Sequence, residues 1–439
     1  MIATCIMLCL MATQASAQQT ATLDLRRCLE DGLQNNLNLQ ITRNREEMAH
    51  NNSTWANAGA MPTMDASAGY RASVTNLDRA ENRATGAVTR NTNYADHTVD
   101  AGVSLGWTLF DGFRIQTSHK QLRVMEQQGE VATRMAVEDL MADIASEYYN
   151  YLQQIIRSKN YNYAMELSRE RLRIASINYQ TGRFSGLDFH QAEVDYHSDS
   201  SAYVRQNEAV LTSNIRLNKL MGEKAVSRRI DLPSHDIEVR NDLNLEELWN
   251  STLSSNTSLL YAQQSTQLAE LDYKKVVARN YPYLKLNAEY GYTHNSYGIN
   301  STRLRDNMGL NGGLTMGINL WDGNRRRERK NAQLTIQNQR LEREQMELEL
   351  RADLTTFWEA YCNNLSLLEL QKKNLQIAHD NLEIAMERYK LGDLSGFDMR
   401  QIEKNLLDAE ERVLQVQYDA KICEISLLLI SGGITSYLQ

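Results

Sequence analysis

The segment YKLGDLSGFDMRQIE, residues 389–403, and the helix that follows it decide how this chain folds. From Met399 to Ile430, apolar residues recur at alternating steps of three and four residues. This spacing is typical of a helix that packs along its whole length against other helices. The apolar positions are Met399, Ile402, Leu406, Ala409, Val413, Val416, Ala420, Cys423, Leu427 and Ile430.

The same helix–turn–helix pattern occurs 210 residues earlier in the chain. A repeated supersecondary unit indicates an internal duplication. We therefore expect a first structural repeat over residues 18–222, a linker over 223–242 and a second repeat over 243–439. The residues that recur are Tyr179/Tyr389, Gly182/Gly392, Ser185/Ser395, Gly186/Gly396, Asp188/Asp398, Gln191/Gln401 and Glu193/Glu403.

Composition and the N-terminus narrow the class of protein. The chain has 439 residues and only three prolines, so long uninterrupted helices are permitted. Its net charge of −8 disfavours nucleic-acid binding, which requires a basic face. Residues 1–17 predict a signal peptide, because an apolar stretch precedes the small residues Ala15-Ser16-Ala17. No later segment has 18 consecutive apolar residues, so the sequence predicts no transmembrane helix.

Each repeat is expected to contain a helix, a β-hairpin and a long helical hairpin. Residues 23–60 predict a helix with a break near Asn35-Asn36, and Pro62 ends it. Four later stretches alternate between apolar and small polar residues, as strands do. The predicted β-hairpins cover about residues 63–110 and 283–321, and the helical hairpins cover 113–221 and 324–430. Alternation is clear over 64–74, 99–109, 284–293 and 308–320, and residues 75–98 include a polar stretch.

The strand pattern predicts an assembly of several chains. Alternating strands of about ten residues are typical of transmembrane barrels, which start at about eight strands. Four strands cannot close a barrel, and unpaired strand edges in lipid cost several kcal/mol per group. Two copies would supply eight strands and three would supply twelve. Twelve is favoured, because two long helical pairs per chain need enough copies to form a hollow cylinder. The predicted fold is mainly α with a transmembrane β-barrel portion. Duplicated long helical hairpins form an α-barrel, and four β-strands per chain contribute to a 12-stranded trimeric barrel.

These features together resemble the outer-membrane efflux (TolC-like) family of trimeric channel-tunnels. The resemblance covers nearly the whole chain after the signal peptide. It depends on the duplicated order of elements, on an Asp-Gly pair after the second strand of each hairpin, and on a Tyr-x-x-Gly motif at each helical tip. The residues are Asp111-Gly112, Asp322-Gly323, Tyr179/Gly182 and Tyr389/Gly392.

The resemblance implies a passive exit duct in the outer membrane of a Gram-negative cell. A homotrimer would extend its helical barrel across the periplasm. There a periplasmic adaptor (membrane fusion) protein would connect it to an inner-membrane pump of the RND or ABC type. Cargo would be drugs, toxic small molecules or polypeptides, and the pump would supply the energy. No catalytic residue, cofactor or metal site is therefore expected, and nucleic acid is not an expected partner.

The resemblance also places the periplasmic entrance just after the helical tips. Asp188 and Asp398 would line it, giving six carboxylates in a trimer that attract cations and titrate together. Tyr389 matches a tyrosine in the family's closing network, and Tyr179 is its counterpart in the first repeat. Leu394 replaces the arginine of that network, and Gln401 replaces a second aspartate, so the closing contacts must differ here. The tip turns that would contact the adaptor contain Gly182, Ser185, Gly186, Gly392, Ser395 and Gly396.

Other interpretations of these residues stay open. Ser185-x-x-Asp188 and Ser395-x-x-Asp398 both resemble capping boxes, so the aspartates can stabilise helix N-termini whether or not they face a lumen. The four tip glycines are most simply turn residues with positive φ. The chain as a whole can also be an exported coiled-coil scaffold without channel activity. A hydrolase or metal-dependent enzyme is disfavoured, because no catalytic or metal-binding motif stands out.

Overall fold

The computed structural model describes residues 21–233, 236–299 and 302–438, and the predicted signal peptide lies outside them. The chain divides into two compact units. The first, here called the helical unit, contains Met1–Asn44, Val131–Tyr261 and Glu344–Gln439. The second, the sheet unit, contains Arg45–Glu130 and Ala262–Arg343. Each unit draws on both sequence repeats, and the repeat boundaries at 222 and 243 stay a prediction.

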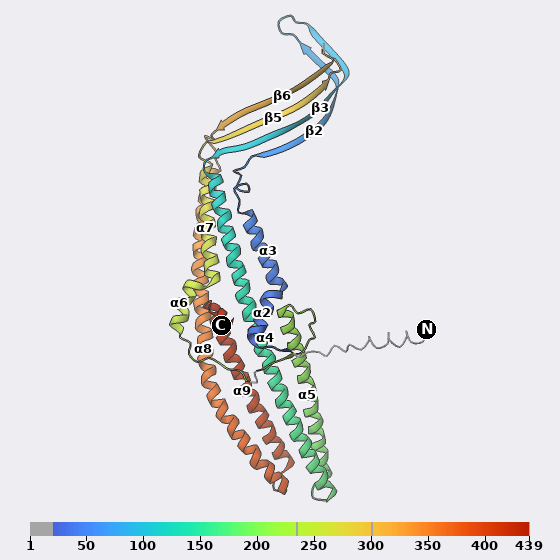
Figure 1. Ribbon diagram of the computed structural model, residues 1–439, viewed down its shortest axis with the longest axis vertical. Coiled ribbons are helices and arrows are strands. Elements are labelled where there is room, and N and C mark those ends of the chain that lie inside the picture. The colour runs from blue at the N-terminus through green and yellow to red at the C-terminus, as the bar shows by residue number, and fades with distance from the viewer. Residues whose placement is uncertain (1–20, 234–235, 300–301, 439) are drawn as a thin grey trace, which may run out of the picture. The chain divides into compact units, whose positions relative to one another are not determined.

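The two repeats contain the same elements in the same order (Figure 1). The first has α2 (Leu25–Asn35), α3 (Leu37–Asn52), β2 (Thr63–Glu81), β3 (Val88–Asp111), α4 (Arg114–Gln180) and α5 (Gly186–Met221). The second has α6 (Leu245–Ser255), α7 (Thr257–Ala278), β5 (Tyr283–Ser296), β6 (Leu304–Gly317), α8 (Arg325–Leu391) and α9 (Gly396–Ile430). Strands β1 (Ala21–Thr22) and β4 (Ile230–Asp231) pair in parallel, and the 3₁₀ helix η1 (Ile434–Leu438) follows α9. The predicted duplication of helices and strands is confirmed.

An asparagine bends the first helix of each repeat in the same way. Asn36 lies between α2 and α3 with extended backbone angles, φ −63° and ψ 122°. Its Nδ2 donates to the carbonyl of Leu220, 2.9 Å away, and its Oδ1 accepts from the next helix. Asn256 has the same angles and donates to the carbonyl of Ile430, also at 2.9 Å. The expected break at Asn35-Asn36 is confirmed. Asn36 anchors the first bent helix to the end of α5, and Asn256 anchors the second to the end of α9.

Some predicted boundaries were wrong. Helix α3 ends at Asn52 rather than at residue 60, because residues 54–59 form a turn in which Gly59 has a φ of +90°. The first β-hairpin, predicted over about residues 63–110, is confirmed, and its strands stay paired through the polar stretch as far as Glu81 and Val88. Ladder hydrogen bonds join backbone groups, so a strand does not need apolar side chains to continue. Strand β6 ends at Gly317, three residues before the alternation in the sequence does.

The sheet unit contains a four-stranded antiparallel sheet in the order β2-β3-β5-β6 (Figure 1). Its register places Val103, Tyr290 and Leu310 side by side, all exposed. One residue earlier on β3, Gly102 faces Gly291, and a Cβ on Gly102 would lie 3.1 Å from the Gly291 Cα. The sheet therefore has one apolar face and one face of small and polar residues. Within the described residues, β2 and β6 each pair with a strand on one side only.

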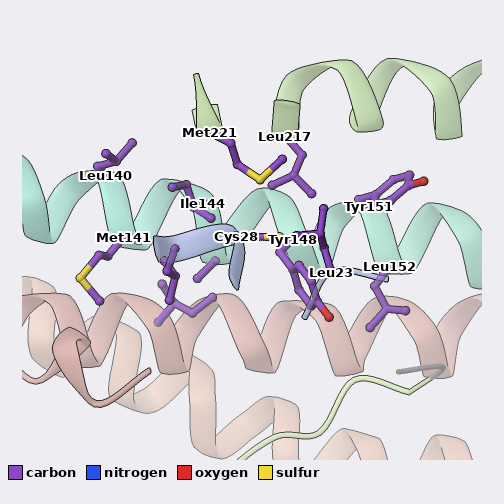
Figure 2. Close-up of a cluster of buried hydrophobic side chains, with 14 of the residues drawn as sticks. Leu23, Cys28, Leu140, Met141, Ile144, Tyr148, Tyr151, Leu152, Leu217 and Met221 are labelled. Atoms are coloured by element: carbon purple, nitrogen blue, oxygen red, sulfur yellow. The ribbon is translucent and has the colours of Figure 1, made fainter. Parts of the chain in front are cut away.

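The core of the helical unit is formed where α2 packs between the long helices of the first repeat. Figure 2 shows Cys28 of α2 among Ile144 and Tyr148 of α4 and Leu217 of α5, and all four are buried. The second repeat forms an equivalent cluster from α6, α8 and α9, which contains Leu248, Leu354, Tyr361 and Leu427. None of the helices in the described ranges combines the length and apolar content needed to cross a membrane.

Candidate functional site: the tips of the helical hairpins

Both hairpin tips reverse the chain with the same backbone geometry. Gly182 has a φ of +75° and Gly392 a φ of +87°, the left-handed conformation that favours glycine. In the first tip, the N–H of Gly182 donates to Tyr179 and that of Arg183 to Asn178, which is the Schellman pattern of a helix end. The expectation of positive φ was wrong for Gly186 and Gly396. These two residues begin α5 and α9, because the serine before each of them caps the helix.

The serines and aspartates after the turns stabilise the N-termini of α5 and α9. Ser185 Oγ accepts from the N–H of Asp188 and donates to its Oδ2, while the Ser185 N–H donates to the same carboxylate at 3.0 Å. Ser395 Oγ likewise accepts from the N–H of Asp398 and donates to its Oδ2, 2.7 Å away. The capping interpretation is confirmed. Both aspartates are exposed, and their position beside a lumen stays a prediction.

The two tip tyrosines differ although their sequence positions match. Tyr389 is only 1% exposed, and its ring lies 6.0 Å from that of Phe184, centroid to centroid. Burial raises the pKa of its hydroxyl. Tyr179 is 49% exposed and stacks on Phe189 at 5.5 Å. Gln401 is exposed, and its Nε2 donates to Asn405 Oδ1 at 2.8 Å. Within one chain, therefore, Tyr389 packs between the two hairpins, whereas Tyr179 stays half exposed on the first hairpin.

Just behind the tips, five charged residues of α4, α5 and α9 form a buried ion cluster. Arg171 is 2% exposed and donates through Nη1 to Asp195 Oδ2 at 2.8 Å. Its Nε lies 3.3 Å from Glu403 Oε2. Arg400 makes two hydrogen bonds of 2.7 Å to Asp199, whose carboxylate also accepts from Ser168. The cluster joins the first hairpin to the second.

The protonation of Glu403 balances the ion cluster. Two guanidinium groups face three carboxyl groups, so a proton on one carboxyl makes the cluster neutral. Burial raises the pKa of Glu403 to about 7, although Arg171 and Arg400 oppose this shift. Neither carboxyl oxygen of Glu403 has a hydrogen bond of good geometry, despite the nearby Arg171. Glu403 therefore exchanges a proton near neutral pH.

The sequence alone did not identify this cluster. Asp199 lies on the packing face of α5, where the three-and-four spacing predicts apolar residues. A charged residue at such a position predicts a buried partner, because an unpaired buried charge is costly. Arg171 and Arg400 gave no comparable signal, since arginine is common on exposed helix faces. No group of three or more potential metal ligands lies together in the part of the chain that the structure describes.

Comparison with known proteins supports the architecture. Residues 28–223 and 248–433 match the model of the outer membrane efflux protein family. A comparison with curated proteins finds no match. Several solved structures resemble the fold over most of both chains. The CmeC outer membrane channel of Campylobacter jejuni is 15% identical to this chain, with a TM-score of 0.76. The match covers 93% of this chain and 85% of the CmeC chain.

Two further structures give the same result. The outer membrane protein VceC of Vibrio cholerae is 16% identical, with 93% of this chain and 96% of VceC covered and a TM-score of 0.72. The open state of the MtrE outer membrane channel of Neisseria gonorrhoeae is 17% identical, with 94% of this chain and 90% of the MtrE chain covered and a TM-score of 0.69. At these identities the similarity shows the fold, and the family match covers both repeats.

Proposed function

Because this chain belongs to the outer membrane efflux protein family, we propose that it is the passive exit duct of a tripartite efflux or type I secretion system. Three copies form the duct in the outer membrane, and their helices extend into the periplasm. A periplasmic adaptor connects them to an inner-membrane pump of the RND or ABC type. The pump supplies the energy, and the cargo is a drug, another toxic small molecule or a polypeptide.

The observation that carries this proposal is the open sheet. Its apolar face is exposed along several strands, through residues such as Val103, Tyr290 and Leu310. Contiguous apolar surface of this kind marks contact with lipid or protein. Strands β2 and β6 each leave one edge unpaired within the described residues, and such edges are not tolerated in lipid. Edges from neighbouring copies would satisfy each other, and three copies give a barrel of twelve strands.

The long helices support a duct rather than a simple pore. Helices α4 and α8 have 67 residues each, which corresponds to about 100 Å of helix. Their ends, with the tips at Gly182 and Gly392, form the entrance and contact the adaptor. Asp188 and Asp398 line that entrance, so a trimer presents six carboxylates that attract cations. Tyr179, Tyr389 and Gln401 belong to the same entrance, with Tyr389 acting from its buried position between the hairpins.

Fractionation and electrical recording test this function. The full-length protein, expressed in a Gram-negative host, is expected in the outer membrane as a trimer that dissociates on heating. Purified trimers are expected to give single-channel conductance in a planar bilayer. Recovery of a water-soluble rod from the periplasm, without conductance, would contradict the duct and support the scaffold.

The entrance is tested separately with charge variants. The double variant Asp188→Asn/Asp398→Asn removes the charge but keeps an oxygen that can accept the capping hydrogen bond. We expect it to weaken the block by multivalent cations applied from the periplasmic side. The double alanine variant should weaken the block equally and also lose about 1 kcal/mol per cap. Unchanged block in both variants would show that the aspartates only cap their helices.

A further inference from the structure

A pocket at one end of the sheet carries an excess of positive charge. It lies in the sheet unit, where α7 ends and where α4 and α8 begin (Figure 1), and has a volume of about 260 Å³. Four basic and two acidic side chains line it, so cations outnumber carboxylates. These residues are Arg114, Arg279, Lys285, Arg325, Asp111 and Asp322.

Two of the four cations are neutralised within the chain. Arg114 Nε donates to Asp111 Oδ2 at 2.9 Å. Arg279 Nη1 donates to Glu328 Oε2 at 2.7 Å. Two cations, Lys285 and Arg325, then remain beside a single acid of the pocket. Neither of them has an ion-pair partner among the residues that the structure describes.

The side chain of Arg325 is held in a way that leaves its binding edge without a partner. Its Nη1 donates to Asn280 Oδ1 at 3.2 Å, which orients the guanidinium. Its Nε and Nη2 are buried and have no hydrogen-bond partner in the described part of the chain. These two nitrogens form the edge that binds a carboxylate or phosphate group through two parallel hydrogen bonds. Because buried N–H groups without an acceptor are costly, this edge favours an oxyanion ligand.

The internal repeat supplies a comparison for this arginine. The sequence pair Asp111 and Arg114 recurs 211 residues later as Asp322 and Arg325. In the first repeat the arginine binds the acid three residues before it. In the second, Asp322 Oδ1 accepts from the N–H of Asn324 at 2.9 Å instead of pairing with Arg325. The same side chain is therefore neutralised locally in one repeat and left for an anion from outside the chain in the other.

We propose that this pocket binds an oxyanion through Arg325 and Lys285, either an inorganic ion or the acidic group of a small organic molecule. Its volume lies just below the range of about 300–1,000 Å³ that is typical of sites for drug-sized ligands. A phosphate, sulfate or carboxylate group therefore fits, and a whole drug-sized molecule does not. Tyr281 and Tyr283 also line the pocket, and their half-exposed rings can contact an attached organic group.

The face of the sheet on which the pocket opens indicates where the ligand comes from. Lys285 lies six residues before Gly291 on β5, so alternation places both on the face of small and polar residues. In the proposed duct the other face contacts lipid, so the ligand comes from the aqueous phase and is not a lipid headgroup. This source rests on the proposed function, whereas the pocket belongs to a single chain.

Titration of the purified full-length protein with inorganic phosphate, at constant ionic strength and followed by calorimetry, tests the pocket. The parent protein is expected to show saturable binding. Arg325→Gln should weaken it by at least about tenfold, the loss expected when charge-assisted hydrogen bonds are removed. Arg325→Lys keeps the charge without the two-nitrogen edge and should have intermediate affinity. The matched control Arg327→Gln removes the same charge at an exposed position of α8 and should bind like the parent.

Thermal unfolding shows whether the variants fold and gives a second measure of binding. Without phosphate, Arg325→Gln is expected to melt no lower than the parent, because it removes buried N–H groups that lack an acceptor. Phosphate should raise the melting temperature of the parent and of Arg327→Gln, since a ligand that binds the folded state stabilises it. It should leave Arg325→Gln nearly unchanged.

Phenyl phosphate distinguishes the two kinds of oxyanion. Binding several-fold tighter than that of inorganic phosphate would support an organic acid as the ligand, and equal affinity would support the free anion. A parent protein that binds neither probe, or an Arg325→Gln variant that binds as tightly as the parent, would overturn the proposal. Conductance without phosphate binding would overturn the pocket and leave the proposed function standing. Binding without conductance would overturn the duct and leave the pocket.

Discussion

The two helical hairpins share a backbone and differ in what their faces can bind. Each tip has a left-handed glycine and a serine cap with an acid three residues later. The first hairpin presents Arg171, Asp195 and Asp199, which are buried against the second. The second presents Asn381, Asn405 and Ala409 at the same positions, in an open groove. The comparison teaches that the two hairpins share the same turn, while their matched faces differ: one is buried against the other hairpin and one lines a groove.

The largest loss of stability is expected from a substitution that breaks the ion cluster. Arg171→Ala removes the buried cation that pairs with Asp195 and leaves Glu403 only Arg400, and breaking a buried ion pair typically costs about 3 kcal/mol or more. We expect faster amide hydrogen exchange in residues 171–199 and 396–406. The control Arg173→Ala removes an exposed arginine paired with Glu170 and should leave the exchange nearly unchanged, because solvent screens an exposed ion pair. Equal exchange in the two variants would mean that the cluster does not hold the hairpins together.

A smaller change in stability is expected when the pH is raised. Burial raises the folded-state pKa of Glu403 from 4.5 to about 7, so the folded chain keeps a proton that the unfolded chain releases. The stability from this group is full below about pH 4.5 and is lost as the pH rises through 7, about 3 kcal/mol in all, of which about 2 kcal/mol is lost between pH 5.5 and pH 8. Asp195 and Asp199 raise this pKa further, and Arg171 and Arg400 lower it.

Hydrogen exchange of the tips at pH 5.5 and pH 8, corrected for intrinsic rates, measures this dependence. Glu403→Gln cannot titrate and should remove the part of the dependence that belongs to the cluster. Glu410, whose pKa burial also raises to about 7, keeps its own contribution. An unchanged pH dependence in Glu403→Gln would place the titrating proton elsewhere.

The smallest expected effect separates the two glycines of one tip. Gly182→Ala places a Cβ on a residue with a φ of +75° and should destabilise the tip by about 1 kcal/mol. Gly186→Ala changes the first residue of α5, where a Cβ would make only ordinary contacts with Tyr179 at 3.6 Å or more. It should be neutral or slightly stabilising. Thermal unfolding of the two variants checks the difference, and equal melting temperatures would contradict it.

Much of the fold was predictable because periodic apolar positions indicate its helices and strands. Seven of the ten seam positions from Met399 to Ile430 are buried, and the alternation around Val103 and Tyr290 marks two paired strands. The hairpin over about residues 63–110 was predicted, but the point at which it turns, after Glu81, was not, since the polar residues there carry no apolar pattern. The caps at Ser185 and Ser395 were predictable from local chemistry.

The ion cluster was harder to predict because it joins residues more than 200 positions apart. Only Asp199 offers a signal in the sequence, as a charge on a packing face. The difference in burial between Tyr179 and Tyr389 could not be predicted either, because both tyrosines occur in the same sequence motif. Which face of a duplicated hairpin is covered depends on its neighbour in space, and a single repeat does not contain that information.

The number of chains in the purified particle tests the central claim most directly. Native mass spectrometry of the protein, released from detergent micelles, is expected to show three times the mass of the mature chain. This result is required if the four-stranded sheet of one chain must join those of two others to remove its open edges. A folded monomer that remains soluble in buffer without detergent would contradict the account.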